Sequence, residues 1–173
     1  MFIFYNFLDP DSCARYKKVI EDFYTSNVQI YGAEHVNNFA NKLRTIDITH
    51  DPIGEKVTNF LESHLRLKLD YYQIALNAWP IGNNVSMLHK HTEQARSGGD
   101  YNSILYLNDD FEGGEFYTEH GLVLKTNKGM LTFFDGKNVM HGVKDLRGNN
   151  RYNIIFWWHN TKKDTEVDNK IYL

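Results

Sequence analysis

The part of the sequence after residue 70 consists of short segments of β-forming residues separated by turn residues. Tyr72, Ile74, Leu76 and Ala78 occupy every second position, which places them on one face of a strand. Further candidate strands are 103–107, 115–118, 122–124, 130–134, 139–143 and 152–158. Turn residues such as Gly113-Gly114 separate them at the spacing of all-β sandwiches and barrels. The pattern predicts an antiparallel sandwich of jelly-roll type.

Two helices are predicted before these strands. Asp9-Pro10 has the pattern of an N-cap followed by proline at the first helical position, and apolar residues then recur at helical spacing up to about residue 27. Asp51-Pro52 repeats the signature, and an apolar stripe continues to near Lys68. Short strands are expected at the N-terminus and over 42–48. We therefore expect an α+β, mainly β fold, a double-stranded β-helix (jelly-roll) sandwich with the N-terminal helices packed on one sheet.

Length, charge and cysteine content limit the possible classes of protein. The 173 residues suit a single domain, 1–173, with helical support over about 1–70, a catalytic core over about 71–159 and a polar tail over 160–173. The formal net charge of -3 gives no general positive field, so no nucleic-acid partner is expected. The lone cysteine, Cys13, and the absence of a long apolar run predict a reducing, cytoplasmic location and no membrane partner. The oligomeric state is not indicated.

The segment His89-Lys90-His91-Thr92-Glu93 is the strongest candidate for a metal site. In an extended chain, His91 and Glu93 lie on one face and can present a nitrogen and a carboxylate oxygen to the same ion. His-x-Glu alone is a weak signal, because it occurs often by chance in exposed polar loops. The other histidines, apart from His141, are expected to be surface or packing residues.

A second segment, from Val139 to Tyr152, contains both a histidine and an arginine. If a hairpin folded symmetrically about Leu146, His141 and Arg151 would face each other across the ladder and line one cavity. The planar fork of arginine can hold a carboxylate through two hydrogen bonds, whereas lysine offers only a point charge. We therefore predict that a dicarboxylate spans from a metal ion to Arg151.

Several motifs, in this order and spacing, resemble the prolyl 4-hydroxylase-like branch of the 2-oxoglutarate/Fe(II) oxygenase family over roughly residues 71–158. They are His91-Thr-Glu93, Ile-Leu-Tyr106-Leu-Asn-Asp, Phe-Glu-Gly-Gly-Glu115-Phe, Lys-Gly129-Met-Leu-Thr-Phe-Phe134, His141-Gly-Val and Arg151-Tyr-Asn-Ile-Ile-Phe-Trp-Trp158. The resemblance implies that His91, Glu93 and His141 are the catalytic iron ligands. It also implies that Arg151 and Tyr106 bind 2-oxoglutarate.

The implied activity is that of a dioxygenase using Fe(II), 2-oxoglutarate and O₂, with ascorbate as a further cofactor of such enzymes. It would hydroxylate a C–H bond of a peptidyl, prolyl-type substrate and convert 2-oxoglutarate to succinate; related branches act on other protein side chains or on small molecules. The loops 31–41 and 94–101 are candidates for substrate recognition.

Two departures leave alternatives open. Glu93 stands where the family has aspartate, and a gap-free alignment from Trp79-Pro80 would make His89, not His91, the first ligand; Leu88 supports the His91 register. A second interpretation is a cupin-like or lectin-like jelly roll that binds a metal or ligand without catalysis. A third is an oxygenase relic that has lost its metal site. Arg151 argues against a site that binds a metal alone.

Overall fold

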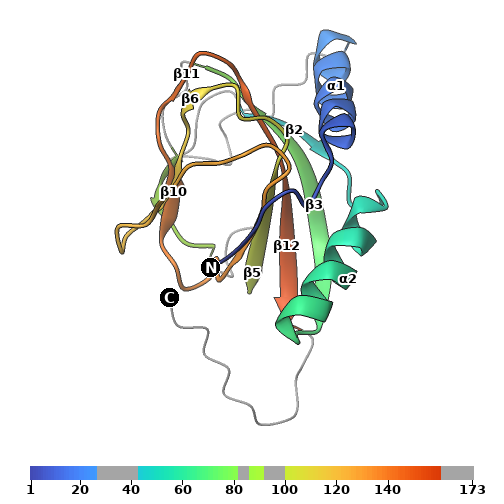
Figure 1. Cartoon of the computed structure of the whole chain (residues 1–173), viewed down its shortest axis with the longest axis vertical. Coiled ribbons are helices and arrows are strands. Elements are labelled where there is room, and N and C mark those ends of the chain that lie inside the picture. The colour runs from blue at the N-terminus through green and yellow to red at the C-terminus, as the bar shows by residue number, and fades with distance from the viewer. Residues whose placement is uncertain (27–42, 82–85, 92–99, 161–173) are drawn as a thin grey trace.

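The computed structural model describes residues 1–26, 43–81, 86–91 and 100–160 (Figure 1). The helices are α1 (Pro10–Ser26) and α2 (Ile53–Leu65). The strands are β1 (Phe2–Phe4), β2 (Arg44–Asp47), β3 (Leu69–Trp79), β4 (Ser86–His89), β5 (Tyr101–Tyr106), β6 (Glu112–Gly113), β7 (Phe116–Thr118), β8 (Val123–Leu124), β9 (Leu131–Phe134), β10 (His141–Val143), β11 (Leu146–Arg147) and β12 (Arg151–Asn160).

The described strands form two main sheets and one small one. A six-stranded sheet has the order β1-β9-β5-β12-β3-β2, a four-stranded sheet has the order β4-β10-β7-β8, and β11 pairs with β6. The paired strands are antiparallel throughout. Both helices lie against one side of the six-stranded sheet, and the four-stranded sheet lies on the other side (Figure 1). The predicted jelly-roll fold with helices packed on one sheet is confirmed.

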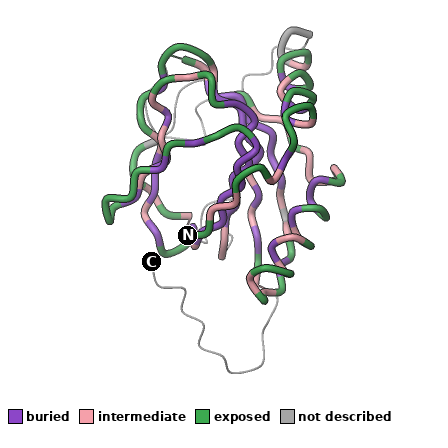
Figure 2. The backbone as a smooth tube through the Cα atoms, viewed as in Figure 1, coloured by how far each residue is buried: buried purple, intermediate pink, exposed green. Residues whose placement is uncertain are grey.

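Strand β12 shows how the sequence separates the two faces of the six-stranded sheet. Its alternate residues Tyr152, Ile154, Phe156 and Trp158 belong to the main hydrophobic core, which includes the buried faces of both helices. The residues between them, beginning with Arg151, face the four-stranded sheet. Figure 2 shows buried backbone concentrated in these central strands and alternating exposure along the helices. The outer face therefore supports the fold, and the inner face is available to a site.

The predicted start of α1 is confirmed, whereas α2 begins one residue later than predicted. The Asp9 carboxylate accepts a hydrogen bond from the Ser12 N–H at 2.8 Å, as an N-cap residue does. At α2, Asp51 accepts one from the Ile53 N–H at 2.9 Å, while the cap position itself is Pro52. Helix α2 ends at Leu65 because Arg66 adopts a left-handed conformation, so the helix is shorter than the apolar stripe suggested.

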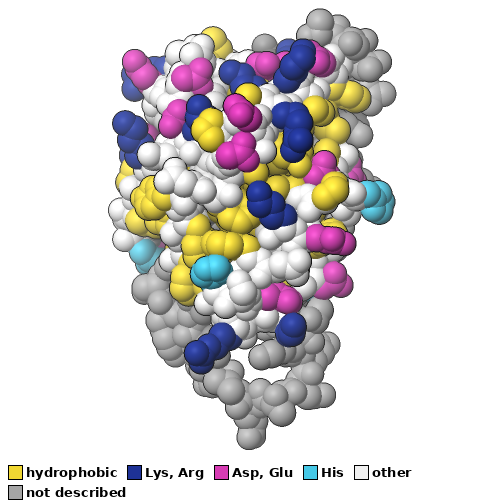
Figure 3. Space-filling model, turned by 45° about the vertical axis from the view of Figure 1, so that its right-hand side comes forward, with side chains coloured by type: hydrophobic (Ala, Val, Ile, Leu, Met, Phe, Trp, Pro, Cys, Tyr) yellow, Lys and Arg dark blue, Asp and Glu magenta, His cyan; other side chains and the backbone are white. Residues whose placement is uncertain are grey.

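The described surface carries charges of both signs. On the face in Figure 3, acidic and basic side chains are interspersed around a central group of hydrophobic side chains. This mixture agrees with the overall charge of -3 and offers no broad basic area on that face for a polyphosphate. Among the described helices, none is long and apolar enough to cross a membrane. The predicted polar tail and substrate loops lie largely outside the described residues, and Glu93 also lies outside them.

Candidate metal and co-substrate site

Three histidines, two on the paired strands β4 and β10 and one just after β4, meet on the inner side of the four-stranded sheet. Strand β4 pairs with β10 so that His89 lies directly opposite His141, and His91 follows two residues later. The ring centroids are 4.5 Å apart for His89 and His141, 4.9 Å for His91 and His141, and 5.2 Å for His89 and His91. One nitrogen from each ring lies within 4.8 Å of the others. We call these three residues the histidine cluster.

Each ring of the histidine cluster has its Nδ1 atom next to an oxygen. The Nδ1 of His89 is 2.9 Å from the Met87 carbonyl, and that of His141 is 2.9 Å from the Val139 carbonyl. The Nδ1 of His91 is 2.7 Å from Oδ1 of Asn102. Because these oxygens can only accept, each Nδ1 carries the proton and each Nε2 carries the lone pair. This is the tautomer of a histidine that binds a metal through Nε2.

Burial keeps these imidazoles neutral. Burial lowers the pKa of His141 to about 3, and repulsion from His89 and His91 contributes to the shift. Burial likewise lowers the pKa of His91 to about 4, with a further contribution from His89. The pKa of His89 is also lowered, again mainly by burial. All three rings are therefore able to bind a cation at neutral pH.

An aromatic layer joins the histidine cluster to the interior of the sandwich. The His141 ring stacks on Phe116 at 5.5 Å and meets Phe134 edge-on at 4.8 Å between centroids. Both phenylalanines belong to a buried apolar group that also contains Tyr106. This group separates the interior between the sheets from water, which strengthens any electrostatic interaction there.

Arg151 lies beside Tyr106, which is a member of this apolar group. The guanidinium carbon of Arg151 is 5.1 Å from the centre of the Tyr106 ring and 5.7 Å from that of Trp79. Arg151 is 1% exposed and Tyr106 is fully buried. Within the described residues, the three guanidinium nitrogens and the Tyr106 hydroxyl have no hydrogen-bond partner of good geometry. A buried cation in this condition is costly unless an anion binds beside it.

Burial and the neighbouring residue shift the pKa values of Tyr106 and Arg151 in opposite directions. Burial raises the pKa of the Tyr106 hydroxyl, while the neighbouring positive charge of Arg151 lowers it. Burial lowers the pKa of Arg151, and Tyr106 opposes that change. An arginine remains charged in a protein in any case. The pair therefore offers a fixed positive charge and a phenolic donor to a carboxylate.

The hairpin predicted about Leu146 is wrong. His141 begins β10 in the four-stranded sheet, whereas Arg151 begins β12 in the six-stranded sheet and pairs with Trp79. The intervening β11 pairs with β6, so the chain crosses from one layer to the other. The two side chains belong to opposite layers of one sandwich and are not cross-strand neighbours.

The structure brings together most of the predicted site, in two groups. His91 and His141 meet in the histidine cluster, and Arg151 lies beside Tyr106. Glu93 lies outside the described residues, so its part in the site stays a prediction. His89 was predicted only as a replacement for His91, yet it stands beside it. The signal that could have found this is the His-x-His spacing itself, since residues two apart share a face of a strand.

The residues present suit an iron ion and a dicarboxylate. Imidazole nitrogens bind first-row transition metals such as iron and zinc. The orphaned guanidinium of Arg151 suits the distal carboxylate of a molecule whose other end reaches the metal, because a buried fork of N–H groups needs acceptors. The chain's own side chains thus supply both the nitrogen ligands for a metal and the guanidinium that can bind a carboxylate.

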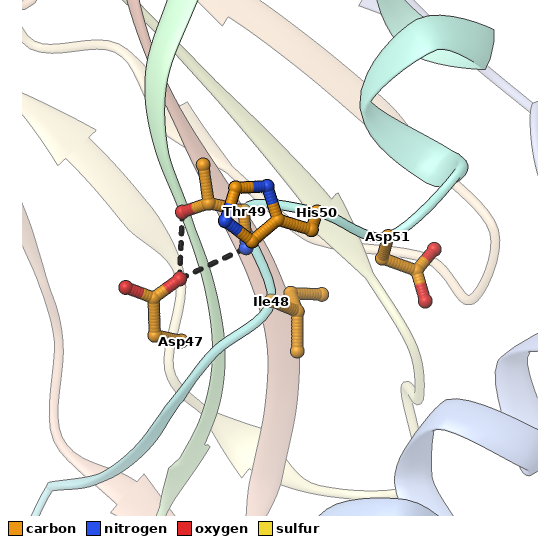
Figure 4. Close-up of a pocket in the computed structure, with 5 residues that line it drawn as sticks. All are labelled: Asp47, Ile48, Thr49, His50 and Asp51. Carbon is orange, nitrogen blue, oxygen red and sulfur yellow. Dashed lines mark hydrogen bonds between the residues drawn. The ribbon is translucent and has the colours of Figure 1, made fainter.

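An acidic pocket elsewhere is explained by the fold. It has a volume of about 490 Å³ and is lined by the connection from β2 to α2, residues 47–51 (Figure 4). The Asp47 carboxylate accepts hydrogen bonds from the N–H and hydroxyl of Thr49. The Asp51 carboxylate accepts bonds from Tyr16 and Ile53. Both carboxylates thus stabilise the turn and the helix start.

Comparison with solved structures identifies the fold. A prolyl-4-hydroxylase of Pseudomonas putida matches with a TM-score of 0.69 and 16% identity, covering 92% of this chain and 91% of the other. The viral collagen prolyl hydroxylase of Paramecium Bursaria Chlorella virus-1, in complex with 2-oxoglutarate, has a TM-score of 0.68 and 15% identity, covering 91% and 94%. This chain has the prolyl hydroxylase fold. A prolyl hydroxylase of Trichoplax adhaerens, in complex with a peptide fragment of hypoxia inducible factor, has a TM-score of 0.65 and 18% identity, covering 92% and 83%.

Sequence comparison points the same way. Prolyl 3-hydroxylase 1 of Gallus gallus is 32% identical over 154 residues, covering 69% of this chain and 21% of the relative. Prolyl 3-hydroxylase 2 of Homo sapiens is 39% identical over 66 residues, covering 34% and 9%. The chain thus spans 9–21% of the length of these relatives. No family model matches the chain. The resemblance to the prolyl hydroxylase branch of the 2-oxoglutarate/Fe(II) oxygenases is confirmed.

Proposed function

We propose that this chain is an Fe(II)- and 2-oxoglutarate-dependent dioxygenase that hydroxylates a C–H bond, with a peptidyl, prolyl-type group as substrate. The observation that carries the proposal is the buried guanidinium of Arg151. It lies on the inner face of the sandwich, joined through one apolar group to imidazoles that are suited to a metal. A protein that only binds a metal has no use for a buried carboxylate clamp in the same interior.

His91 and His141 hold the iron in this proposal, with Glu93 as the predicted carboxylate ligand. Their Nδ1 hydrogen bonds orient the rings, so that the Nε2 lone pairs are fixed before the metal arrives. Iron held there would supply, together with 2-oxoglutarate and O₂, the oxidising power to hydroxylate an unactivated C–H bond, with 2-oxoglutarate converted to succinate and CO₂. The proposal includes ascorbate as a further cofactor of the enzyme.

Arg151 and Tyr106 bind and orient the co-substrate. Arg151 presents its fork to the distal carboxylate, and the Tyr106 hydroxyl donates a hydrogen bond to the same group. Phe116, Phe134 and the rest of the apolar group exclude water from the space between clamp and histidines. Holding the co-substrate at both ends fixes its orientation on the metal and reduces the entropy lost in reaching the reactive geometry.

The nature of the relatives supports a peptidyl substrate. The curated relatives are prolyl 3-hydroxylases, and one structural neighbour was solved with a peptide fragment bound.

Cys13, the one cysteine of the chain, is buried and free, which supports a reducing, cytoplasmic location as part of the proposal.

Anaerobic titration tests the proposal. Adding Fe(II) and then 2-oxoglutarate to the purified chain should produce the weak visible charge-transfer band of the chelate. Arg151→Lys should weaken 2-oxoglutarate binding by at least about tenfold while leaving Fe(II) binding unchanged, because lysine cannot form the bidentate pair. Absence of the band in the wild type would favour the non-catalytic jelly roll, and equal loss of both ligands in the variant would make Arg151 structural.

Substrate class needs a separate assay. Proline-containing peptides incubated with Fe(II), 2-oxoglutarate and O₂ should gain one oxygen atom by mass spectrometry, with succinate formed in equal amount. Succinate without any oxidised peptide, across collagen-like and other proline-rich sequences, would contradict the prolyl-type substrate and redirect the search to other side chains.

A further inference from the structure

We infer that His89 is itself a metal ligand, so that His89, His91 and His141 together form a three-imidazole site. The inference deepens the proposed function and rests on it for the identity of the metal. It differs in the ligand set, because it needs no carboxylate from Glu93.

Strand pairing is the first observation behind the inference. The pairing of β4 with β10 places His89 opposite His141, which makes them neighbours across the ladder, and the period of the extended chain brings His91 to the same side. An ion about 2.1 Å from each nitrogen would hold the nitrogens about 3–4 Å apart. The observed limit of 4.8 Å is close enough for small ring rotations to close the site.

Hydrogen bonding at the rings is the second observation. Nδ1 of His89 meets a backbone carbonyl as Nδ1 of His141 does, at 2.9 Å in both cases. The partner of His91 is the Asn102 side chain, whose Nδ2 atom faces the Phe156 carbonyl at 3.4 Å and so leaves Oδ1 as the acceptor. All three rings are thereby set in the same tautomer. A histidine that only packs beside a two-histidine site does not need this arrangement.

The charge of the site is the consequence. Three neutral imidazoles leave the full double positive charge on a divalent ion, whereas a carboxylate ligand would cancel half of it. Three ligands on one side still leave three positions of an octahedral ion for other molecules. The chelating end of a dicarboxylate then meets a more positive metal, which favours anionic ligands over water.

Metal binding by variants of the full chain tests the inference without any assay of activity. Fe(II) affinity is measured by anaerobic equilibrium dialysis, with no 2-oxoglutarate present. Cu(II) is then substituted, and nitrogen hyperfine lines in its electron paramagnetic resonance spectrum count the bound imidazoles. The variants are His89→Ala, Glu93→Gln and, as a control, His120→Ala, whose side chain is 70% exposed beside Glu119.

His89→Ala should weaken Fe(II) binding at least about tenfold and remove one nitrogen from the Cu(II) spectrum, as expected for loss of a ligand. His120→Ala should keep the wild-type affinity and three nitrogens, and Glu93→Gln should keep three nitrogens. Wild-type Fe(II) affinity and three nitrogens in His89→Ala would overturn the inference. If His89→Ala does not fold, His89→Gln replaces it, with circular dichroism in a chelator confirming the fold.

This outcome is separable from that of the proposed function. Three nitrogens on Cu(II), together with no charge-transfer band from Fe(II) and 2-oxoglutarate, would leave the three-imidazole site standing and remove the oxygenase. A normal band with only two nitrogens on Cu(II) would do the reverse.

Discussion

The two faces of the six-stranded sheet differ in what they do with hydrogen-bonding groups. On the outer face, β12 contributes Ile154, Phe156 and Trp158, and the Trp158 indole donates to the Ser103 hydroxyl at 2.8 Å. On the inner face, the same strand contributes Arg151 and Asn153, whose side-chain nitrogens and oxygen have no partner among the described residues. One strand thus carries a saturated core on one side and unsatisfied polar groups on the other. The inner face is less stable than it could be, and that is where ligands are expected.

The largest expected effect is on the outer face. Phe156→Ala should lower the free energy of unfolding by about 3–5 kcal/mol, because it removes a fully buried ring and leaves a cavity. Ile155→Ala, one position along and only partly buried, should cost less. Denaturant unfolding of both variants measures the difference. Equal costs would mean that the two faces contribute alike to stability.

Acid should lower the stability of the fold by protonating the histidine cluster. In the unfolded chain histidine has a pKa near 6.5, whereas in the fold burial lowers the pKa of His91 to about 4 and of His141 to about 3. The unfolded state therefore binds more protons in this window, so stability falls as the pH drops from about 6.5 towards 4.

A metal-free sample in chelator should lose about 4 kcal/mol of stability between pH 7 and pH 5, about 2 kcal/mol from each of these two residues. The double variant His91→Asn, His141→Asn should show a flatter profile in the same denaturant titration. An unchanged profile would mean that the pH dependence arises elsewhere.

Replacing the unsatisfied amide should stabilise the protein. Asn153 is fully buried, and neither atom of its amide is hydrogen-bonded within the described residues. Asn153→Leu should raise the free energy of unfolding by about 1 kcal/mol, since it removes a desolvated polar group and keeps the number and branching of the side-chain atoms. Thermal unfolding without ligands measures this. A loss of stability would show that the amide is satisfied in solution, and would weaken the contrast between the faces.

The smallest expected effect on stability concerns a glycine behind the cluster. A Cβ on Gly136 would collide with Oδ1 of Asn102 and lie 3.2 Å from Nδ1 of His91. Gly136→Ala should therefore displace the His91 ring and weaken Fe(II) binding about tenfold, as loss of an orienting partner does. Equilibrium dialysis measures the affinity, and unfolding in chelator should change by less than about 1 kcal/mol. Unchanged affinity would show that Asn102 yields without moving His91.

The periodicity of the sequence predicted the positions of helices and strands well, but it predicted poorly which strands pair with each other. The N-cap of α1, the alternation along β3 and the run of β-forming residues in β12 are local signals, and the structure has these elements where the sequence placed them. The two-residue strands β6 and β11 are too short to show any period. Without them, the segment from His141 to Arg151 reads as a simple hairpin, although it passes between two sheets.

The same limit applies to the site. The motifs selected His91, His141, Arg151 and Tyr106, because residue type and order survive in sequence. The role of His89 depends on its pairing with His141, and that contact joins strands far apart in the chain. Pairing of this kind is decided by packing of the whole sandwich, which no local pattern encodes.

The two groups of site residues lie on strands that differ in how many neighbouring strands hold them in place. Arg151 begins β12, which is bonded on both sides, to β3 and β5, whereas His89 ends β4, a four-residue strand at the edge of its sheet among the described strands. Segments with few neighbours open at lower free energy than the centre of a sheet. Amide hydrogens around His89 should consequently exchange with solvent long before those of β12. Iron could then leave through a brief local opening while the rest of the molecule keeps its shape.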